Sequence, residues 1–209
     1  MILIAKVRYE VKRYFQERLF LVALVAILFI TGIVFGFLAA KILDKPAQND
    51  LISFIDQGLH GETVLPNHLY IRQIMVSQIQ TVFFLFFMGI SVIGIPLALL
   101  LIFTRGFVIG FSVGFLLQNM GFKGVVLVIT GILPQNLLII PALFLMLIAI
   151  IDCAAALTKI RFTKYPISLG TELIRCSLIT LLVLVVMILA GLIQGYLSPL
   201  IASWLGSVF

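Results

Sequence analysis

The sequence predicts an all-α, polytopic helical membrane protein with five transmembrane helices and interfacial amphipathic helices. Of its 209 residues, 63% are hydrophobic and only 11% are charged, whereas a soluble domain carries about 25% charged residues. Apolar runs recur, each long enough to cross a hydrocarbon core of about 30 Å. A membrane β-barrel would instead show short segments of alternating polarity.

The amino-terminal part predicts a surface helix followed by a first span. Residues 1–18 combine five basic side chains with apolar residues at helical spacing, a pattern typical of an amphipathic helix at the cytoplasmic interface. The apolar run at 19–40 exceeds the length of about 7–15 residues expected for the core of a cleaved signal peptide. It therefore predicts a span that stays in the membrane.

A polar stretch at 41–80 predicts an extracytoplasmic segment. After Pro66, the stretch predicts an amphipathic helix that leads straight into the second span. Four apolar residues form the face of that helix: Ile71, Met75, Ile79 and Val82.

The later spans are expected at 83–103, 106–120, 125–151 and 173–196. Thr104-Arg105-Gly106 is interpreted as a tight turn between the second and third spans. Arg105 and Asp152 are expected at span ends, where charged side chains are inexpensive. Residues 152–172 are interpreted as a basic loop, and Pro199 is expected to end the fifth span. Residues 198–209 then form an extracytoplasmic tail.

The fourth hydrophobic run contains two prolines and a polar pair: Pro134, Gln135, Asn136 and Pro141. Each proline removes a backbone donor, which predicts a kinked or interrupted helix. A second interpretation is a re-entrant half-helix at 125–133 followed by a full span at 137–154. The polar pair either forms a substrate or partner site, or satisfies freed backbone groups and links helices; the second role is the commoner one.

Glycines at helical spacing predict close helix contacts. The candidate positions for helix packing or oligomerisation are Gly89, Gly94, Gly106, Gly110 and Gly114. Small residues four apart let helix backbones approach in a membrane. Further pairs, Gly32 with Gly36 and Gly191 with Gly195, have the same spacing. Such faces pack helices within one chain or join two copies, so a homodimer stays open.

The distribution of basic residues predicts the orientation. With the amino terminus inside, ten Lys and Arg residues fall on the cytoplasmic side and four on the outer side. The excess of basic residues inside favours a cytoplasmic amino terminus and an extracytoplasmic carboxyl terminus in the cell membrane. The net charge of +6 thus indicates contact with membrane lipid rather than with nucleic acid.

No catalytic constellation is present in the sequence. There is no HExxH motif, and the only histidines, His60 and His68, lie eight apart in the polar segment. Cys153 and Cys176 have no metal-ligand spacing and are interpreted as small packing residues. The sequence therefore predicts a protein that is not an enzyme, with no cofactor and no metal.

The stretch from residue 83 to residue 141 closely resembles the stage II sporulation protein M family. The matching features are Gly89-Ile90-Ser91, Gly94-Ile95-Pro96, Arg105-Gly106-Phe107, Gly110-Phe111, Gly114-Phe115 and Leu133-Pro134-Gln135-Asn136. The resemblance implies a non-enzymatic scaffold that recruits two cell-wall hydrolases, stage II sporulation proteins D and P, during engulfment in endospore formation. It also implies that 41–80 and 198–209 are the surfaces exposed to them.

A permease-like subunit of an ABC-type exporter is the alternative function. Its basic loop at 152–172 would dock a cytoplasmic ATPase. This alternative predicts a polar path through the bundle, whereas the sequence places few polar residues inside the spans.

Overall fold

A computed structural model describes residues 18–59, 67–90, 94–162 and 169–208. No strand occurs in these ranges, so the all-α class is confirmed. The elements are α2 (Leu19–Lys41), α3 (Lys45–Leu59), α4 (Asn67–Ile90), α5 (Gly94–Leu127), the π-helical turn η1 (Val128–Ile132), α6 (Leu133–Phe162) and α7 (Leu169–Val208). The amphipathic helix expected at 1–18 lies outside the described residues except for Arg18.

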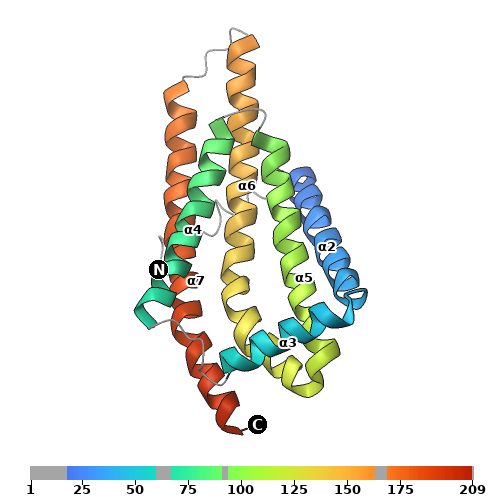
Figure 1. Ribbon diagram of the computed structural model, residues 1–209. Helices are drawn as coiled ribbons and strands as arrows, with labels where there is room; N and C mark the ends of the chain where they lie inside the picture. Colours follow the sequence, from blue (N-terminus) through green and yellow to red (C-terminus); the bar gives the residue numbers. More distant parts are fainter. Residues whose placement is uncertain (1–17, 60–66, 91–93, 163–168, 209) are drawn as a thin grey trace.

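Long helices lie side by side, and α3 crosses the end of the bundle where α2 finishes (Figure 1). α2, α5 and α7 run toward that end, whereas α4 and α6 run away from it. Figure 1 also shows α6 and α7 extending beyond the other helices at the opposite end. The bundle therefore has one end covered by α3 and one end formed by the α6–α7 hairpin.

Within the described residues, four helical stretches are long and apolar enough to cross a membrane: Leu19–Lys41, Leu69–Gly89, Gly94–Ala156 and Leu173–Tyr196. The third has 63 residues and would measure about 95 Å as a straight helix, three times the hydrocarbon thickness. It bends back at Gly121, where φ is 53° and ψ is −122°. Counting its two arms separately gives five crossings; which end faces the cytoplasm stays a prediction.

The expected boundary between the second and third spans is wrong. Residues 104–106 do not form a turn, because α5 runs as one helix from Gly94 and the Thr104 hydroxyl donates to the Leu100 carbonyl at 2.8 Å. α4 ends at Ile90, and α5 begins at Gly94. The end of α4 and the start of α5 lie close together, because a Cβ on Gly94 would lie 2.6 Å from the Cα of Met88. The spans at 83–103 and 106–120 are therefore replaced by α4 and α5.

Two further boundaries differ from expectation. Residues 152–172 are mostly helical, since α6 continues to Phe162 and α7 starts at Leu169. α7 also continues through Pro199 to Val208. One proline removes a single backbone bond and is tolerated in a long membrane helix where neighbouring groups compensate. The helix predicted to continue from the polar segment into the second span is confirmed by α4.

α2 and α5 pack in parallel against each other through glycines on both helices. Gly32 and Gly36 face the α5 backbone at Phe107 and Phe111, where added Cβ atoms would lie 3.0 Å and 2.7 Å from the two amide nitrogens. Gly110 faces Ile33 in return, at 2.7 Å from its Cα. The two helix backbones approach this closely because glycines stand at the contact positions of both helices.

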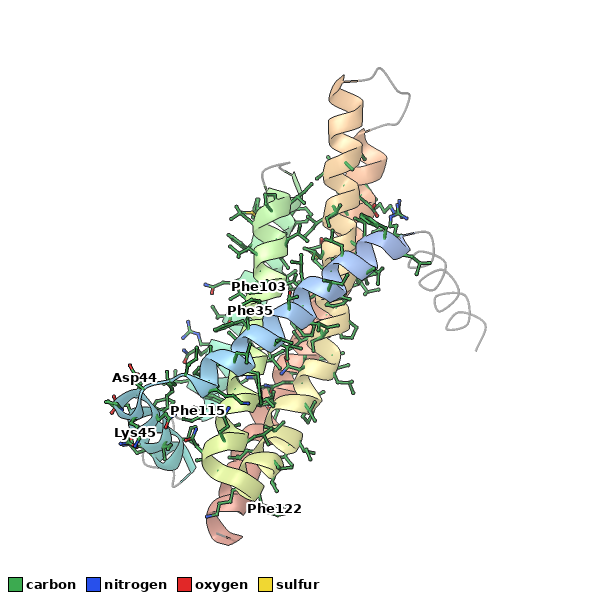
Figure 2. All side chains as sticks on the ribbon, turned by 90° about the vertical axis from the view of Figure 1, so that its right-hand side faces the viewer. Phe35, Asp44, Lys45, Phe103, Phe115 and Phe122 are labelled. Atoms are coloured by element: carbon green, nitrogen blue, oxygen red, sulfur yellow. The ribbon has the colours of Figure 1, made fainter. Side chains whose placement is uncertain are left out.

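Aromatic rings border this glycine seam. Phe107, Phe111 and Phe115 stack along α5 with centroid separations of 6.3 and 6.2 Å. Figure 2 shows Phe35 of α2 beside Phe103 of α5, with their centroids 6.2 Å apart. Offset and tilted ring pairs of this kind add dispersion and quadrupole attraction to the packing.

α6 supplies the centre of the bundle. Met146, Leu147, Ile148 and Ile150 are at most 2% exposed, and Phe144 makes an edge-to-face contact with Phe29 of α2 at 5.6 Å. Their burial on several sides fits a helix surrounded by others, since apolar residues all round a helix indicate a buried position.

At the end where α2 begins, Arg18 forms an ion pair with Asp152 of α6. The two side chains are 23% and 20% exposed, so the pair lies partly shielded from solvent. It joins the first residue of the described chain to the central helix. This position agrees with the expectation that Asp152 lies near a span end, where charge is inexpensive.

Candidate functional site

All five candidate glycines are buried inside the chain. Gly106, Gly110 and Gly114 face α2, Gly89 faces Ile150 of α6, and Gly94 faces the end of α4. Gly191 and Gly195 of α7 likewise face Met75 and Ile71 of α4. The glycine faces that raised the homodimer hypothesis are therefore occupied by helices of the same chain.

The proline segment does not interrupt the helix. α6 begins with Leu133 and passes through both Pro134 and Pro141, so neither a break at Pro134 nor a re-entrant end at 133 is present. The irregularity comes just before, in η1, where the Leu133 amide donates to the Val128 carbonyl five residues earlier. A π-helical turn shifts the hydrogen-bond register at the point where Pro134 supplies no donor.

One member of the polar pair, Asn136, has a structural role next to η1. The Asn136 amide donates to the Ile132 carbonyl at 2.7 Å, and the Thr130 hydroxyl donates to the Val126 carbonyl at 2.6 Å. Both bonds satisfy backbone carbonyls around the irregular turn. Gln135 lies half-buried beside them. Asn136 therefore bonds a backbone carbonyl of the same helical run, but its acceptor is Ile132 and not Thr130, the carbonyl that Pro134 leaves without its helical donor. The predicted role at backbone groups freed by Pro134 is not the one that this bond fulfils.

The charge at Arg105 lies deep in the bundle rather than at a span end, as the sequence had suggested. Arg105 follows Gly94 by eleven residues, about 17 Å along the helix. The parallel helix gives the same depth: Gly32, which contacts α5 on both sides of Arg105 at Phe103 and Phe107, is near the middle of α2. Removing Arg105 from the cytoplasmic count leaves nine basic residues against four.

Arg105 reaches from α5 to a polar residue on α4. Its guanidinium donates to the Thr81 hydroxyl at 3.0 Å, and that hydroxyl donates to the Ser77 carbonyl at 2.9 Å. In the described part of the chain, no carboxylate pairs with Arg105. An arginine has five donors, so most of its hydrogen-bonding capacity and all of its charge remain uncompensated.

α4 carries a polar groove that leads up to this arginine. The groove is lined by Leu69, Arg72, Gln73, Val76, Ser77 and Gln80, and we call it the α4 groove. Ser77 connects it to Thr81 and hence to Arg105. The groove mixes polar and apolar side chains of α4, and Arg105 of α5 adjoins its inner end through Thr81.

A second polar group of α4 points inward. Gln78 is 5% exposed, and its Oε1 has no hydrogen-bond partner in the described structure. An unsatisfied buried acceptor costs about 1–3 kcal/mol. α4 thus carries polar side chains on its outward face and on its inward face.

The sequence contained a signal for this site. Polar residues recur three to four apart on α4, at positions 73, 77 and 80–81. Arg105 is preceded by 32 uncharged residues (73–104) and followed by 17 (106–122). An ionisable residue inside a span is by default a functional candidate. The signal was hidden by interpreting Thr104-Arg105-Gly106 as a turn.

The arrangement offers polar groups that suit recognition of a partner. The described residues bring no nucleophile and base together, and no three His, Cys, Asp or Glu side chains among them are close enough to hold a metal. His60 lies outside the described residues, and the side chain of His68 is likewise not described. What the geometry provides is a cation with hydroxyl and amide groups in a low-dielectric setting, where such groups bind an anionic or polar partner strongly.

Comparison with known proteins identifies one family. A family model described as stage II sporulation protein M matches residues 25–199. This range includes all the helices described here except the ends of α2 and α7. No curated protein and no solved structure matches the chain.

Proposed function

Because the chain belongs to the stage II sporulation protein M family, we propose that it is a non-enzymatic membrane scaffold. In this role it recruits and localises peptidoglycan hydrolases during engulfment in endospore formation. The family makes it a sporulation-related membrane protein, and its long apolar helices give it the means to sit in the membrane as a multi-pass protein. The hydrolase partners proposed are stage II sporulation proteins D and P.

The observation that carries the proposal is the gathering of three segments at one end of the bundle. α3 crosses that end, and the α5–α6 turn and the end of α7 lie there as well (Figure 1). Figure 2 shows Asp44 and Lys45 at the start of α3 and Phe122 at the turn. With the predicted orientation, this end faces the cell wall, where the substrate of a hydrolase lies.

Exposed aromatic residues mark this end as a binding surface. Phe54 of α3 is 69% exposed and Phe122 of the turn is 75% exposed. Aromatic side chains are enriched in protein interfaces. We take these two residues as the anchors for an extracytoplasmic partner.

The exporter alternative receives less support. A permease needs a polar path across the bundle, yet the central helix presents fully buried apolar residues such as Met146 and Ile150. The helical extension of α6 and α7 could still contact a cytoplasmic ATPase. A homodimer also remains a proposal, now without the glycine faces as its support.

The scaffold role is tested by localisation in sporulating cells. Fluorescently tagged hydrolases are expected to collect at the engulfing membrane with this chain and to disperse, still active, when it is deleted. The double variant Phe54→Ser/Phe122→Ser should disperse them while the scaffold itself remains at the membrane. Phe20→Ser, which removes a residue 78% exposed at the opposite end, is the matched control. Normal localisation in the deletion strain would refute the role.

A further inference from the structure

We propose that the α4 groove, together with Arg105, binds a transmembrane helix of another membrane protein, and that this helix carries a carboxylate at mid-membrane depth. The proposal concerns the site within the bilayer and does not depend on whether the partner is a cell-wall hydrolase. The interaction would be made within the membrane rather than on the extracytoplasmic face described above.

The α4 groove is a poor surface to leave against lipid. Arg72, Gln73, Ser77 and Gln80 are exposed on it, and lipid tails offer no hydrogen bonds. Polar side chains inside a membrane almost always face other helices or a cavity, because unsatisfied groups are costly in hydrocarbon. These exposed positions therefore require a partner that the described part of this chain does not supply.

The dimensions fit a helix better than a lipid headgroup. The groove runs from Leu69 to Gln80, about 17 Å along α4, and Arg105 lies at its inner end near the bilayer centre. A headgroup reaches only the outer end. A helix lying along α4 contacts the whole groove and brings a side chain to Arg105 at the correct depth.

The charge identifies the chemistry of that side chain. Arg105 has a hydroxyl as its described partner and no carboxylate, and Arg72 adds a second cation to the groove. A guanidinium pairs best with a carboxylate, through two parallel hydrogen bonds. The low dielectric of the membrane strengthens such a pair relative to water.

A second copy of this chain does not supply the carboxylate. Among the described side chains of its membrane-spanning helices, Asp152 is the single carboxylate, and it is already paired with Arg18. Asp44 and Asp50 lie at the α3 end, away from mid-depth. Since none of the described carboxylates of a second copy is available at this depth, we take the occupant to be a different protein with an aspartate or glutamate inside a span.

The test uses the purified full-length protein in phosphatidylcholine vesicles. The probe is a labelled synthetic leucine-rich transmembrane helix with one glutamate at its centre, and association is measured by energy transfer. The glutamate helix is expected to bind at least about tenfold more tightly than an all-leucine helix, a preference within reach of polar contacts in membranes. The variant Arg105→Leu should abolish this preference.

Charge exchange and steric blocking make the result specific. Arg105→Glu should prefer a helix with a central lysine over the glutamate helix. Val76→Trp, which fills the groove and leaves Arg105 in place, should weaken binding without changing the thermal unfolding midpoint. Val108→Trp, at a residue 54% exposed on α5, is the matched control and should bind as the unmodified protein does.

Three outcomes would overturn the proposal. Equal binding of the glutamate and leucine helices to the unmodified protein would show that no carboxylate is recognised. Self-association of the protein that Arg105→Leu abolishes would make a second copy the occupant. Displacement of the glutamate helix by phosphatidylglycerol, in proportion to its mole fraction, would make a lipid phosphate the ligand.

Discussion

Two seams in this bundle carry the same glycine motif and use it differently. α2 and α5 bring Gly32, Gly36 and Gly110 against backbone atoms of the partner helix, with added Cβ atoms at 2.7–3.0 Å from backbone amide nitrogens or Cα. α7 brings Gly191 and Gly195 against the side-chain tips of Met75 and Ile71 on α4. In the first seam both helices contribute glycines to the contact, whereas in the second only α7 does.

The difference shows that a glycine pair four apart predicts that a helix can be approached, but not how closely. Backbone cannot yield, whereas the end of a methionine side chain is flexible and adaptable. The tolerance of each seam to an added methyl group should therefore differ, even though the spacing in the sequence is the same. The variants below are ordered from the largest expected effect to the smallest.

Gly110→Ala should be the most damaging of the four. Its Cβ would meet the Ile33 backbone at 2.7 Å from Cα, so the helices must separate and lose contact along the whole seam. Overpacking of this kind costs about 3 kcal/mol or more. Thermal unfolding of the detergent-solubilised protein, followed by the monodisperse fraction, measures the loss. Gly170→Ala, with nothing within 4 Å, is the matched control, and an equal loss in both would contradict the explanation.

Gly121→Ala should destabilise by about 1–3 kcal/mol, the cost of a non-glycine residue in a disfavoured backbone region. Here the cause is conformational rather than steric packing, because φ is 53° and nothing lies within 4 Å of the added Cβ. The same unfolding assay applies. Gly131→Ala, also with open space but without a positive φ, separates the two causes: its stability should not fall.

Gln78→Leu should raise the free energy of unfolding by about 1 kcal/mol, because it removes a buried acceptor without a partner. This variant tests whether the buried polar side chain on the inner face of α4 lowers the stability of the protein. A loss comparable with that of a large-to-small core substitution would instead show that Gln78 has a required hydrogen-bond role. Gln80→Leu, on the exposed side of α4, is the comparison and should change stability less.

Gly191→Ala should have the smallest effect, within about 1 kcal/mol of the unmodified protein. The added Cβ would lie 3.3 Å from Met75 Cε, which can move, and alanine gains about 1 kcal/mol of helix propensity over glycine. If Gly191→Ala proved as damaging as Gly110→Ala, the distinction between the two seams would fail. The double variant with Met75→Ala should remove any residual clash.

Much of the bundle could be predicted from particular residues. The apolar face formed by Ile71, Met75, Ile79 and Val82 predicted a helix leading into a span, and α4 is that helix. Asp152 was expected at a span end, where it pairs with Arg18. These features depend on local periodicity and on the cost of charge in hydrocarbon, both of which are properties of the sequence.

The candidate site could not be predicted in the same way. Arg105 looked like a turn residue because Thr104 and Gly106 flank it, and both residue types occur in turns. In the structure, Gly106 is needed for contact with Phe29 of α2, and Thr104 bonds within its own helix. The contacts of Gly106 and Arg105 lie on neighbouring helices, and a single sequence does not show which helix is the neighbour.

The sequence by itself determined the membrane class and the helical content, because hydrophobic length and periodicity are local and the bilayer accepts little else. Its short motifs, such as Leu133-Pro134-Gln135-Asn136, carried the resemblance to the family. The tertiary structure alone decided that α2 and α5 form one backbone-to-backbone seam, that the chain reverses at Gly121, and that Arg105 of α5 bonds Thr81 of α4. Those features depend on which helices meet and in which register. Contact between distant segments follows from the packing of the whole bundle, which cannot be predicted from any short stretch of the sequence.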